Sequence, residues 1–146
     1  MTTQLSTAID RLRNAWIEAG CGIRPGVTDD DIARFASVHD VGLPIDVAAY
    51  FRAVDGMHEG EHDMHVIRFW PLAEMKPALS ELPEGDQGLA SYFVFADYSL
   101  WAHAYAVRLG AGPSDVVLVG AEKPFALAPT FAEFLDVYIA RPELLF

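Results

Sequence analysis

The chain has 146 residues, of which 52% are hydrophobic and 21% charged, and this composition is typical of one well-packed globular domain spanning residues 1–146. Its formal net charge of −11 argues against nucleic acid or an anionic membrane surface as a ligand, because phosphate groups would be repelled, and it favours a basic protein partner. The single cysteine excludes an intrachain disulfide, and without a signal-peptide pattern or a membrane-length apolar run we expect a cytoplasmic protein.

Three helices are predicted in the N-terminal third. The first ends near the GCG at residues 20–22, and its apolar stripe recurs every three or four residues, at Leu5, Ile9, Leu12 and Trp16. Thr28 is a candidate N-cap for a second helix, because three aspartates follow where the helix dipole favours acids. Pro44 suits the first turn of a third helix, and Gly56 is placed to close it.

The pattern then changes to the alternation of strands. MHVIRFW (64–70) predicts a strand, PLAEMKPAL (71–79) a short helix or turn, and ELPEGDQG (81–88) an exposed loop. Three more strands are predicted within residues 90–98, 100–109 and 115–120, and a last helix after Pro129. The predicted fold class is α+β, with N-terminal helices and a C-terminal helix packed on a mainly antiparallel sheet of about four to six strands.

The segment His58-Glu59-Gly60-Glu61-His62 matches the HExxH pattern of zinc-dependent proteases. On a helix, His58 and His62 would share a face and bind zinc, with Glu59 as general base. Gly60 disfavours a helix, and no apolar stripe surrounds the motif, so we predict a loop without a catalytic zinc site. A zinc hydrolase using His58, Glu59 and His62 stays the less favoured alternative, as does adventitious metal binding by His58, His62 or His65.

Acidic residues are concentrated in the middle of the chain. Eight acids stand against two bases, Arg68 and Lys76, and the acids are Asp55, Glu59, Glu61, Asp63, Glu74, Glu81, Glu84 and Asp86. Such a run is either a solvated surface or a surface for a cationic partner. Asp97, Ser99 and His103 are not predicted to form a catalytic triad, because no oxyanion hole or strained nucleophile turn accompanies them.

Four segments, in order, are similar to the SUKH superfamily, which includes fungal cell-wall-assembly regulators and bacterial immunity proteins. Residues 29–56 resemble its opening signature through Ile32, Phe35, Gly42, Leu43, Pro44, Asp46, Tyr50, Asp55 and Gly56. Later segments resemble it through Trp70, Leu72, Glu74, Phe95, Ala96, Asp97, Tyr98, Trp101, Ala128, Phe131, Glu133, Phe134 and Leu135. The resemblance covers about Thr28 to Ile139.

The resemblance implies a non-enzymatic binding module without cofactor or catalytic residue. Its bacterial members neutralise a cognate toxin, often a nuclease, and the acidic charge independently favours a basic partner. We therefore expect an immunity protein, with a regulatory scaffold for host proteins as the alternative. The expected partner surface consists of Glu59, Glu61, Asp63, Glu81, Glu84 and Asp86, together with Trp101.

Overall fold

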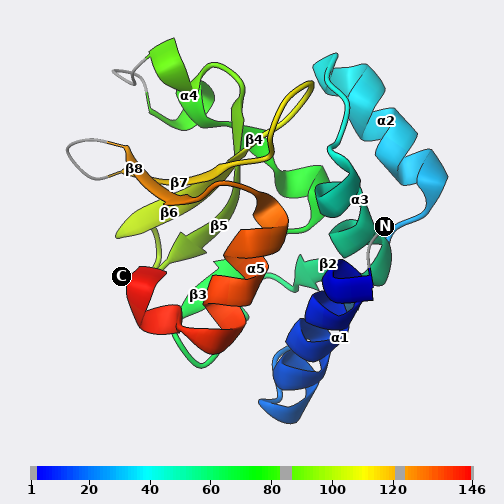
Figure 1. Cartoon of the computed structure of the whole chain (residues 1–146), viewed down its shortest axis with the longest axis vertical. Coiled ribbons are helices and arrows are strands. Elements are labelled where there is room, and N and C mark those ends of the chain that lie inside the picture. Colours follow the sequence, from blue (N-terminus) through cyan, green and yellow to red (C-terminus); the bar gives the residue numbers. More distant parts are fainter. Residues whose placement is uncertain (1–2, 83–86, 121–123, 146) are drawn as a thin grey trace.

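The computed structural model describes residues 3–82, 87–120 and 124–145, and a six-stranded antiparallel sheet is its centre (Figure 1). The strand order is β3-β5-β6-β7-β8, and β4 pairs with β5 beside this path. The strands are β3 (Ile67–Phe69), β4 (Lys76–Pro77), β5 (Tyr92–Tyr98), β6 (His103–Arg108), β7 (Val116–Val119) and β8 (Phe125–Ala128). A separate two-stranded sheet pairs β1 (Ile23–Pro25) with β2 (Val54–Met57). The predicted α+β class is confirmed.

Five α-helices and three short 3-10 helices complete the described fold. The α-helices are α1 (Thr3–Glu18), α2 (Asp29–His39), α3 (Ile45–Ala53), α4 (Ala78–Glu81) and α5 (Phe131–Ala140). The 3-10 helices are η1 (Leu72–Glu74), η2 (Gln87–Leu89) and η3 (Pro142–Leu145). Within the described ranges, no helix is long and apolar enough to cross a membrane.

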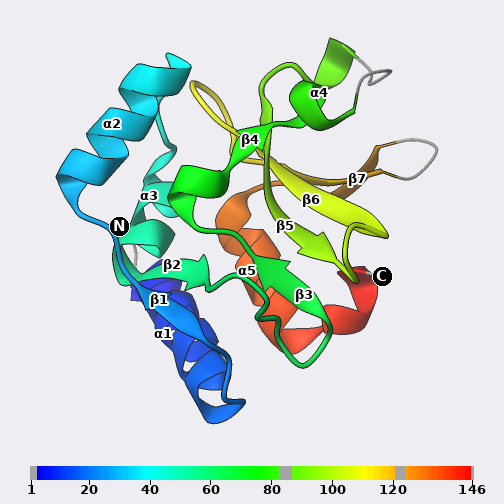
Figure 2. The same ribbon diagram turned by 180° about the vertical axis from the view of Figure 1, so that it is seen from behind.

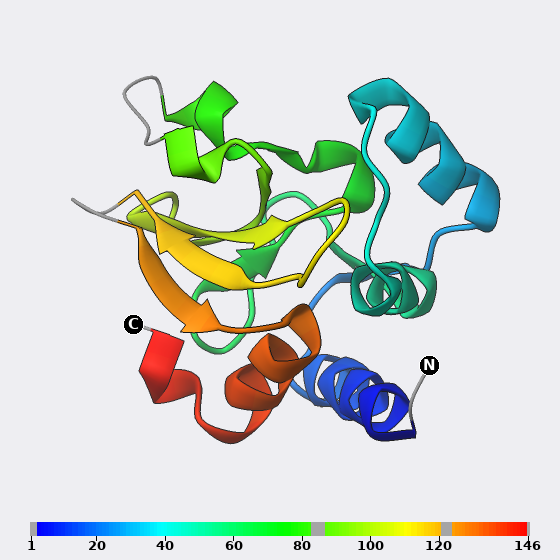
Figure 3. The same cartoon turned by 45° about the horizontal axis from the view of Figure 1, so that its top comes forward.

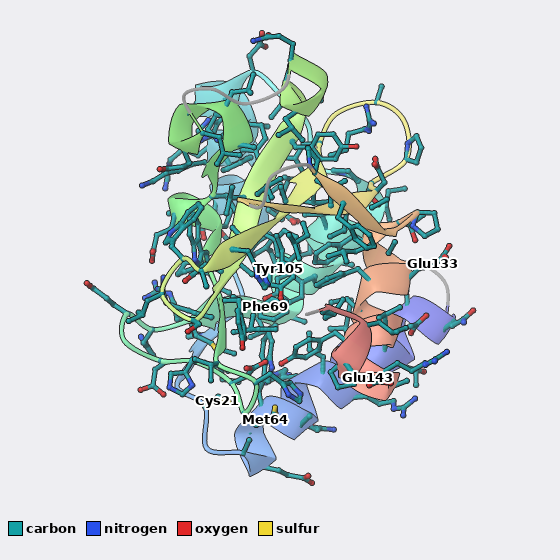
Figure 4. All side chains as sticks on the ribbon, turned by 90° about the vertical axis from the view of Figure 1, so that its left-hand side faces the viewer. Cys21, Met64, Phe69, Tyr105, Glu133 and Glu143 are labelled. Carbon is teal, nitrogen blue, oxygen red and sulfur yellow. The ribbon has the colours of Figure 1, made fainter. Side chains whose placement is uncertain are left out.

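The two faces of the six-stranded sheet are covered differently. One, which we call the helix face, packs on α1, α3 and α5. Figure 3 shows α1 (blue) and α5 (orange) below the strands and α3 (teal) to their right. Figure 2 shows β5 and β6 in front of α5. Large rings fill this interface: Phe69 contacts Trp16 at 4.8 Å between ring centroids, and Figure 4 shows Phe69 and Tyr105 in the interior.

The opposite face, which we call the groove face, has smaller side chains and a thinner cover. Its cluster includes Val94, Ala104 and Ala106, with α4 and η2 contributing Ala78 and Leu89. Strand alternation sends successive residues to opposite faces, which is why the apolar run of β5 and β6 is buried on both sides.

The predicted helix starts rest on local hydrogen bonds. Thr28 and Asp31 form a reciprocal capping box at the start of α2. Thr130, which follows Pro129, is the N-cap of α5, and its side chain accepts from Glu133 N at 3.1 Å. The stripe that the spacing predicts for α1, Leu5, Ile9, Leu12 and Trp16, is buried.

The role predicted for Gly56 is wrong. Helix α3 ends at Ala53, and Gly56 lies in β2 with a φ of +64°. An added Cβ would lie 2.6 Å from the carbonyl oxygens of Phe69 and Trp70, so glycine is required by the close approach of two backbones. The short strands β1, β2 and β8 are not predicted from the sequence; FALA in β8 contains no β-branched residue and no polar alternation.

Candidate partner-binding surface

The HEGEH segment is a turn that follows β2. Its backbone closes through Glu61 N, which donates to His58 O at 3.1 Å, and Gly60 has a φ of +83°. The predicted loop is confirmed, and the two histidines therefore lack the helical spacing that a zinc site of this class needs. His62 uses its Nδ1 locally, 2.8 Å from the carbonyl oxygen of Asp63. Among the described residues, no group of three or more His, Cys, Asp or Glu side chains is placed to hold a metal ion.

Asp63 belongs to the interior and not to the surface. It is 2% exposed, and its Oδ1 accepts from His65 N at 2.8 Å and from Ile67 N at 2.9 Å. Its Oδ2 accepts from the hydroxyl of Tyr138, whose oxygen in turn accepts from Trp16 Nε1 at 2.8 Å. The prediction of Asp63 as a partner contact is therefore wrong, because its carboxylate anchors the loop to α5 and α1.

A groove of about 420 Å³ lies on the groove face, beside the end of β5. Residues from several segments line it, among them Arg68, Trp70, Glu74, Glu81, Asp97 and Trp101. Two predicted partner residues, Glu81 and Trp101, thus meet at one site although they are separated in sequence. Gly60, between the predicted Glu59 and Glu61, also lines the groove and brings the HEGEH turn to its margin.

The turn between β5 and β6 presents two large apolar side chains beside this groove. Leu100 is 96% exposed and Trp101 39% exposed, and the Trp101 ring packs on Trp70 at 5.7 Å between centroids. Asp97, only 8% exposed, accepts from Trp70 Nε1 at 2.6 Å and from Trp101 N at 3.2 Å. The buried carboxylate therefore holds the turn and the floor of the groove together.

Left-handed backbone is concentrated at this end of the sheet. Ser99, Leu100 and Trp101 have φ values of +49°, +54° and +72°, and Val66 has +63°. Ser99 N donates to Val66 O at 2.9 Å, which joins the two turns. A left-handed φ costs an L-residue about 1–2 kcal/mol, and such strain is typical of functional sites. This conformation is an independent reason to regard the groove and its turn as the candidate site.

Two ion pairs form part of the groove lining. Arg68 donates to both carboxylate oxygens of Glu74, at 3.1 and 3.2 Å, and also to the carbonyl oxygens of Met57 and His58. Lys76 Nζ lies 3.3 Å from one oxygen of Glu81, and the Lys76 side chain is 56% exposed. An exposed ion pair of this kind contributes little to stability, so the Lys76–Glu81 pair is broken more easily than the Arg68–Glu74 pair.

The remaining predicted residues have different environments. Glu59 is exposed, whereas Glu61 is half-buried and accepts from Gly22 N at 2.7 Å. Glu84 and Asp86 lie outside the described residues. Sequence reasoning did not predict Leu100 or Asp97 as parts of this surface. Residues 100–102, predicted as the start of a strand, belong instead to the turn before β6. The apolar pair Leu100-Trp101 at the junction of two predicted strands is a signal that could have found the first.

Two reactive residue types have environments that keep them neutral. Burial, followed by the negative charges of Asp63 and Glu61, raises the pKa of the Cys21 thiol, which disfavours the nucleophilic thiolate. Burial lowers the pKa of His103, whose ring stacks on Tyr98 at 4.7 Å and whose Nε2 lies 3.0 Å from the Tyr105 hydroxyl. Both side chains have a structural account.

Comparison with known proteins adds no relative to this description. No protein-family model matches the chain, and no curated protein is significantly similar to it. The resemblance to the SUKH superfamily therefore remains a proposal that rests on the residues of this chain.

Proposed function

We propose that the protein is a cytoplasmic, non-enzymatic binding module, an immunity protein of SUKH type that neutralises a basic toxin domain, such as a nuclease, by direct contact. The observation that carries this proposal is the strained turn that presents Leu100 and Trp101 beside a groove whose lining includes three acidic and two basic side chains. An exposed aromatic anchor bordered by charged residues is the usual composition of a protein-binding hot spot.

The charge of the chain suits the same partner. A net charge of −11 steers a basic protein toward the surface, and nucleases are basic because they bind phosphates. Of the described predicted acids, Glu81 lines the groove, and Glu59 and Glu61 flank Gly60, which also lines it. Glu81 and the exposed Glu59 would face the partner once the turn has docked, whereas the Glu61 carboxylate accepts from Gly22 N.

The residues that carry the resemblance have structural partners. Asp46 Oδ2 accepts from Ser114 Oγ at 2.7 Å and from Ala132 N at 3.0 Å, which ties α3 to the start of α5. Asp55 Oδ1 accepts from Leu72 N at 2.7 Å, and burial raises the pKa of this carboxyl. These contacts support a shared fold signature, with roles in packing and not in catalysis.

The direct test is protection of cells from a toxin. The chain is co-expressed with candidate basic toxin domains, and growth is measured alongside the affinity of each purified pair at low and high salt. We expect growth to be restored and a complex that weakens as salt rises. Cells that die despite normal expression of the chain would refute the immunity function, and a zinc ion retained stoichiometrically after dialysis would favour the hydrolase.

The surface is tested with two triple variants of equal charge. Replacing Glu59, Glu61 and Glu81 by glutamine should slow association about tenfold at low salt. The matched control replaces Glu18, Glu133 and Glu143, which are exposed on α1, α5 and η3. Figure 4 shows Glu133 and Glu143 at the α5 side of the molecule. Equal association rates for the two variants would exclude the acidic groove as the docking surface.

A further inference from the structure

The floor of the groove carries a buried carboxylate without a cationic partner. Asp97 is 8% exposed, and its two hydrogen-bond donors, the Trp70 indole and the Trp101 amide, are both neutral. Within the described ranges no lysine, arginine or histidine forms an ion pair with it. Burying a carboxylate away from a counter-charge is unfavourable, so this position attracts a cation.

The arginine expected to pair with Asp97 within the fold binds other groups. Arg68 stands directly opposite Asp97 in the β3–β5 ladder, where a cross-strand ion pair would be expected. Its guanidinium instead binds both oxygens of Glu74 and two backbone carbonyls. The groove therefore keeps its own arginine at the wall and leaves the Asp97 floor without one.

The walls suit a planar cation. The Trp101 ring is part of the lining and is partly open to solvent, and a guanidinium stacks on such a ring more readily than an ammonium does. Glu81 supplies a carboxylate that a guanidinium can bind through two parallel hydrogen bonds. Lys76 now makes only one 3.3 Å contact with Glu81, and as an exposed side chain it can be displaced into solvent.

We propose that the groove is a socket for one arginine side chain of the partner, stacked on Trp101, paired with Glu81 and attracted by Asp97. This inference rests on the proposed function and names the chemistry of the partner at that surface. Arginine is chosen over lysine because the ring and the carboxylate both favour a flat, weakly hydrated cation.

The test uses three blocked tripeptides of the form Gly-X-Gly, where X is arginine, lysine or citrulline. Citrulline has nearly the shape of arginine and no charge. Binding is followed by NMR through the indole N–H signals of Trp70 and Trp101 in the folded, isotope-labelled chain. We expect the arginine peptide to bind about tenfold or more tightly than the citrulline peptide, and more tightly than the lysine peptide. Equal affinity for arginine and citrulline, or for arginine and lysine, would overturn the assignment.

Single substitutions test where the arginine peptide binds. W101A and E81Q should each weaken binding of the arginine peptide several-fold. D97N should do so as well, because it removes the charge; it keeps an acceptor for the Trp70 indole but loses the one for the Trp101 amide. F125A is the matched control, because Phe125 is an exposed aromatic on β8, at 63% exposure. Unchanged peptide affinity in W101A and E81Q would also overturn the assignment. The Trp16 indole signal, from the bond to Tyr138, reports that each variant is folded.

The two proposals fail in different ways. If W101A abolishes binding of the toxin while arginine and citrulline peptides bind alike, the surface is correct and the arginine socket is wrong. If the arginine peptide binds at Trp101 and the chain protects no cell, the socket is correct and the immunity function is wrong.

Discussion

The helix face and the groove face of the sheet differ in what they bury and in what they leave open. Large aromatic rings and three helices close the helix face, where the buried Trp16 indole donates to the Tyr138 hydroxyl. The groove face has alanine and valine under a short helix, and it ends in an exposed turn with left-handed leucine and tryptophan. The difference indicates that stability is concentrated on one side of the sheet, which allows a strained surface on the other.

The largest predicted effect compares leucine side chains buried under the two faces of the sheet. Leu135→Ala, at 0% exposure on the helix face, should lower the free energy of unfolding by about 4 kcal/mol, because the surrounding rings cannot close the cavity. Leu89→Ala, at 5% exposure under the groove face, should cost only about 2 kcal/mol, because its thin cover can relax. Urea denaturation followed by tryptophan fluorescence measures both, and equal losses would contradict unequal packing.

Two glycines provide the next comparison. Gly56→Ala should destabilise by about 3 kcal/mol, because the new Cβ would overlap backbone atoms of Phe69 and Trp70 in addition to the strained φ. Gly60→Ala, in the turn beside the groove, has a similar φ and nothing within 4 Å of the added atom, so about 1 kcal/mol is expected. Thermal unfolding of the pair distinguishes close approach from backbone strain, and a Gly60 variant as damaged as the Gly56 variant would refute the distinction.

A smaller, pH-dependent effect is expected at the other end of the groove face. Burial by itself would raise the pKa of Asp115, but hydrogen bonds from Arg108, at 2.7 Å, and from Tyr92 hold this pKa below its usual value of 3.8. The pair therefore stabilises the fold above that pH, and the contribution is lost as pH falls through the lowered pKa.

Asp115→Asn should accordingly cost about 1 kcal/mol at neutral pH, since Arg108 is partly exposed to screening solvent. The difference from the parent should shrink below pH 3.8, as the parent carboxyl also becomes neutral. Urea titrations of both proteins across this range measure it. A difference that is constant with pH would show that Asp115 acts through packing alone.

The smallest predicted effect is a gain in stability. Leu100→Asn should raise the free energy of unfolding by about 0.5–1 kcal/mol, because asparagine tolerates a left-handed φ and the leucine is too exposed to lose packing. The same change should weaken toxin binding. Ile45→Asn, also exposed but in α3 without a left-handed φ, should not stabilise, and calorimetry of the two variants provides the comparison. A destabilised Leu100 variant would contradict stored strain at the turn.

Local patterns in the sequence determined the helices and the fold class. The stripe of α1, the capping box at Thr28 and the apolar runs of β5 and β6 depend on neighbours within a few residues, so they can be read before any tertiary contact is known. The acidity of the middle segment and the loop at HEGEH follow from composition and from Gly60 in the same way.

Only the tertiary structure decided which acids face solvent and which segments meet. Asp63 and Glu59 lie in one acidic run, yet one is buried under Tyr138 and the other is exposed, because distant helices determine which carboxylate finds donors. Gly56 is required by backbone atoms more than ten residues away. The groove, too, joins β3, α4 and the β5–β6 turn, and no local pattern encodes a contact between segments that only the assembled fold brings together.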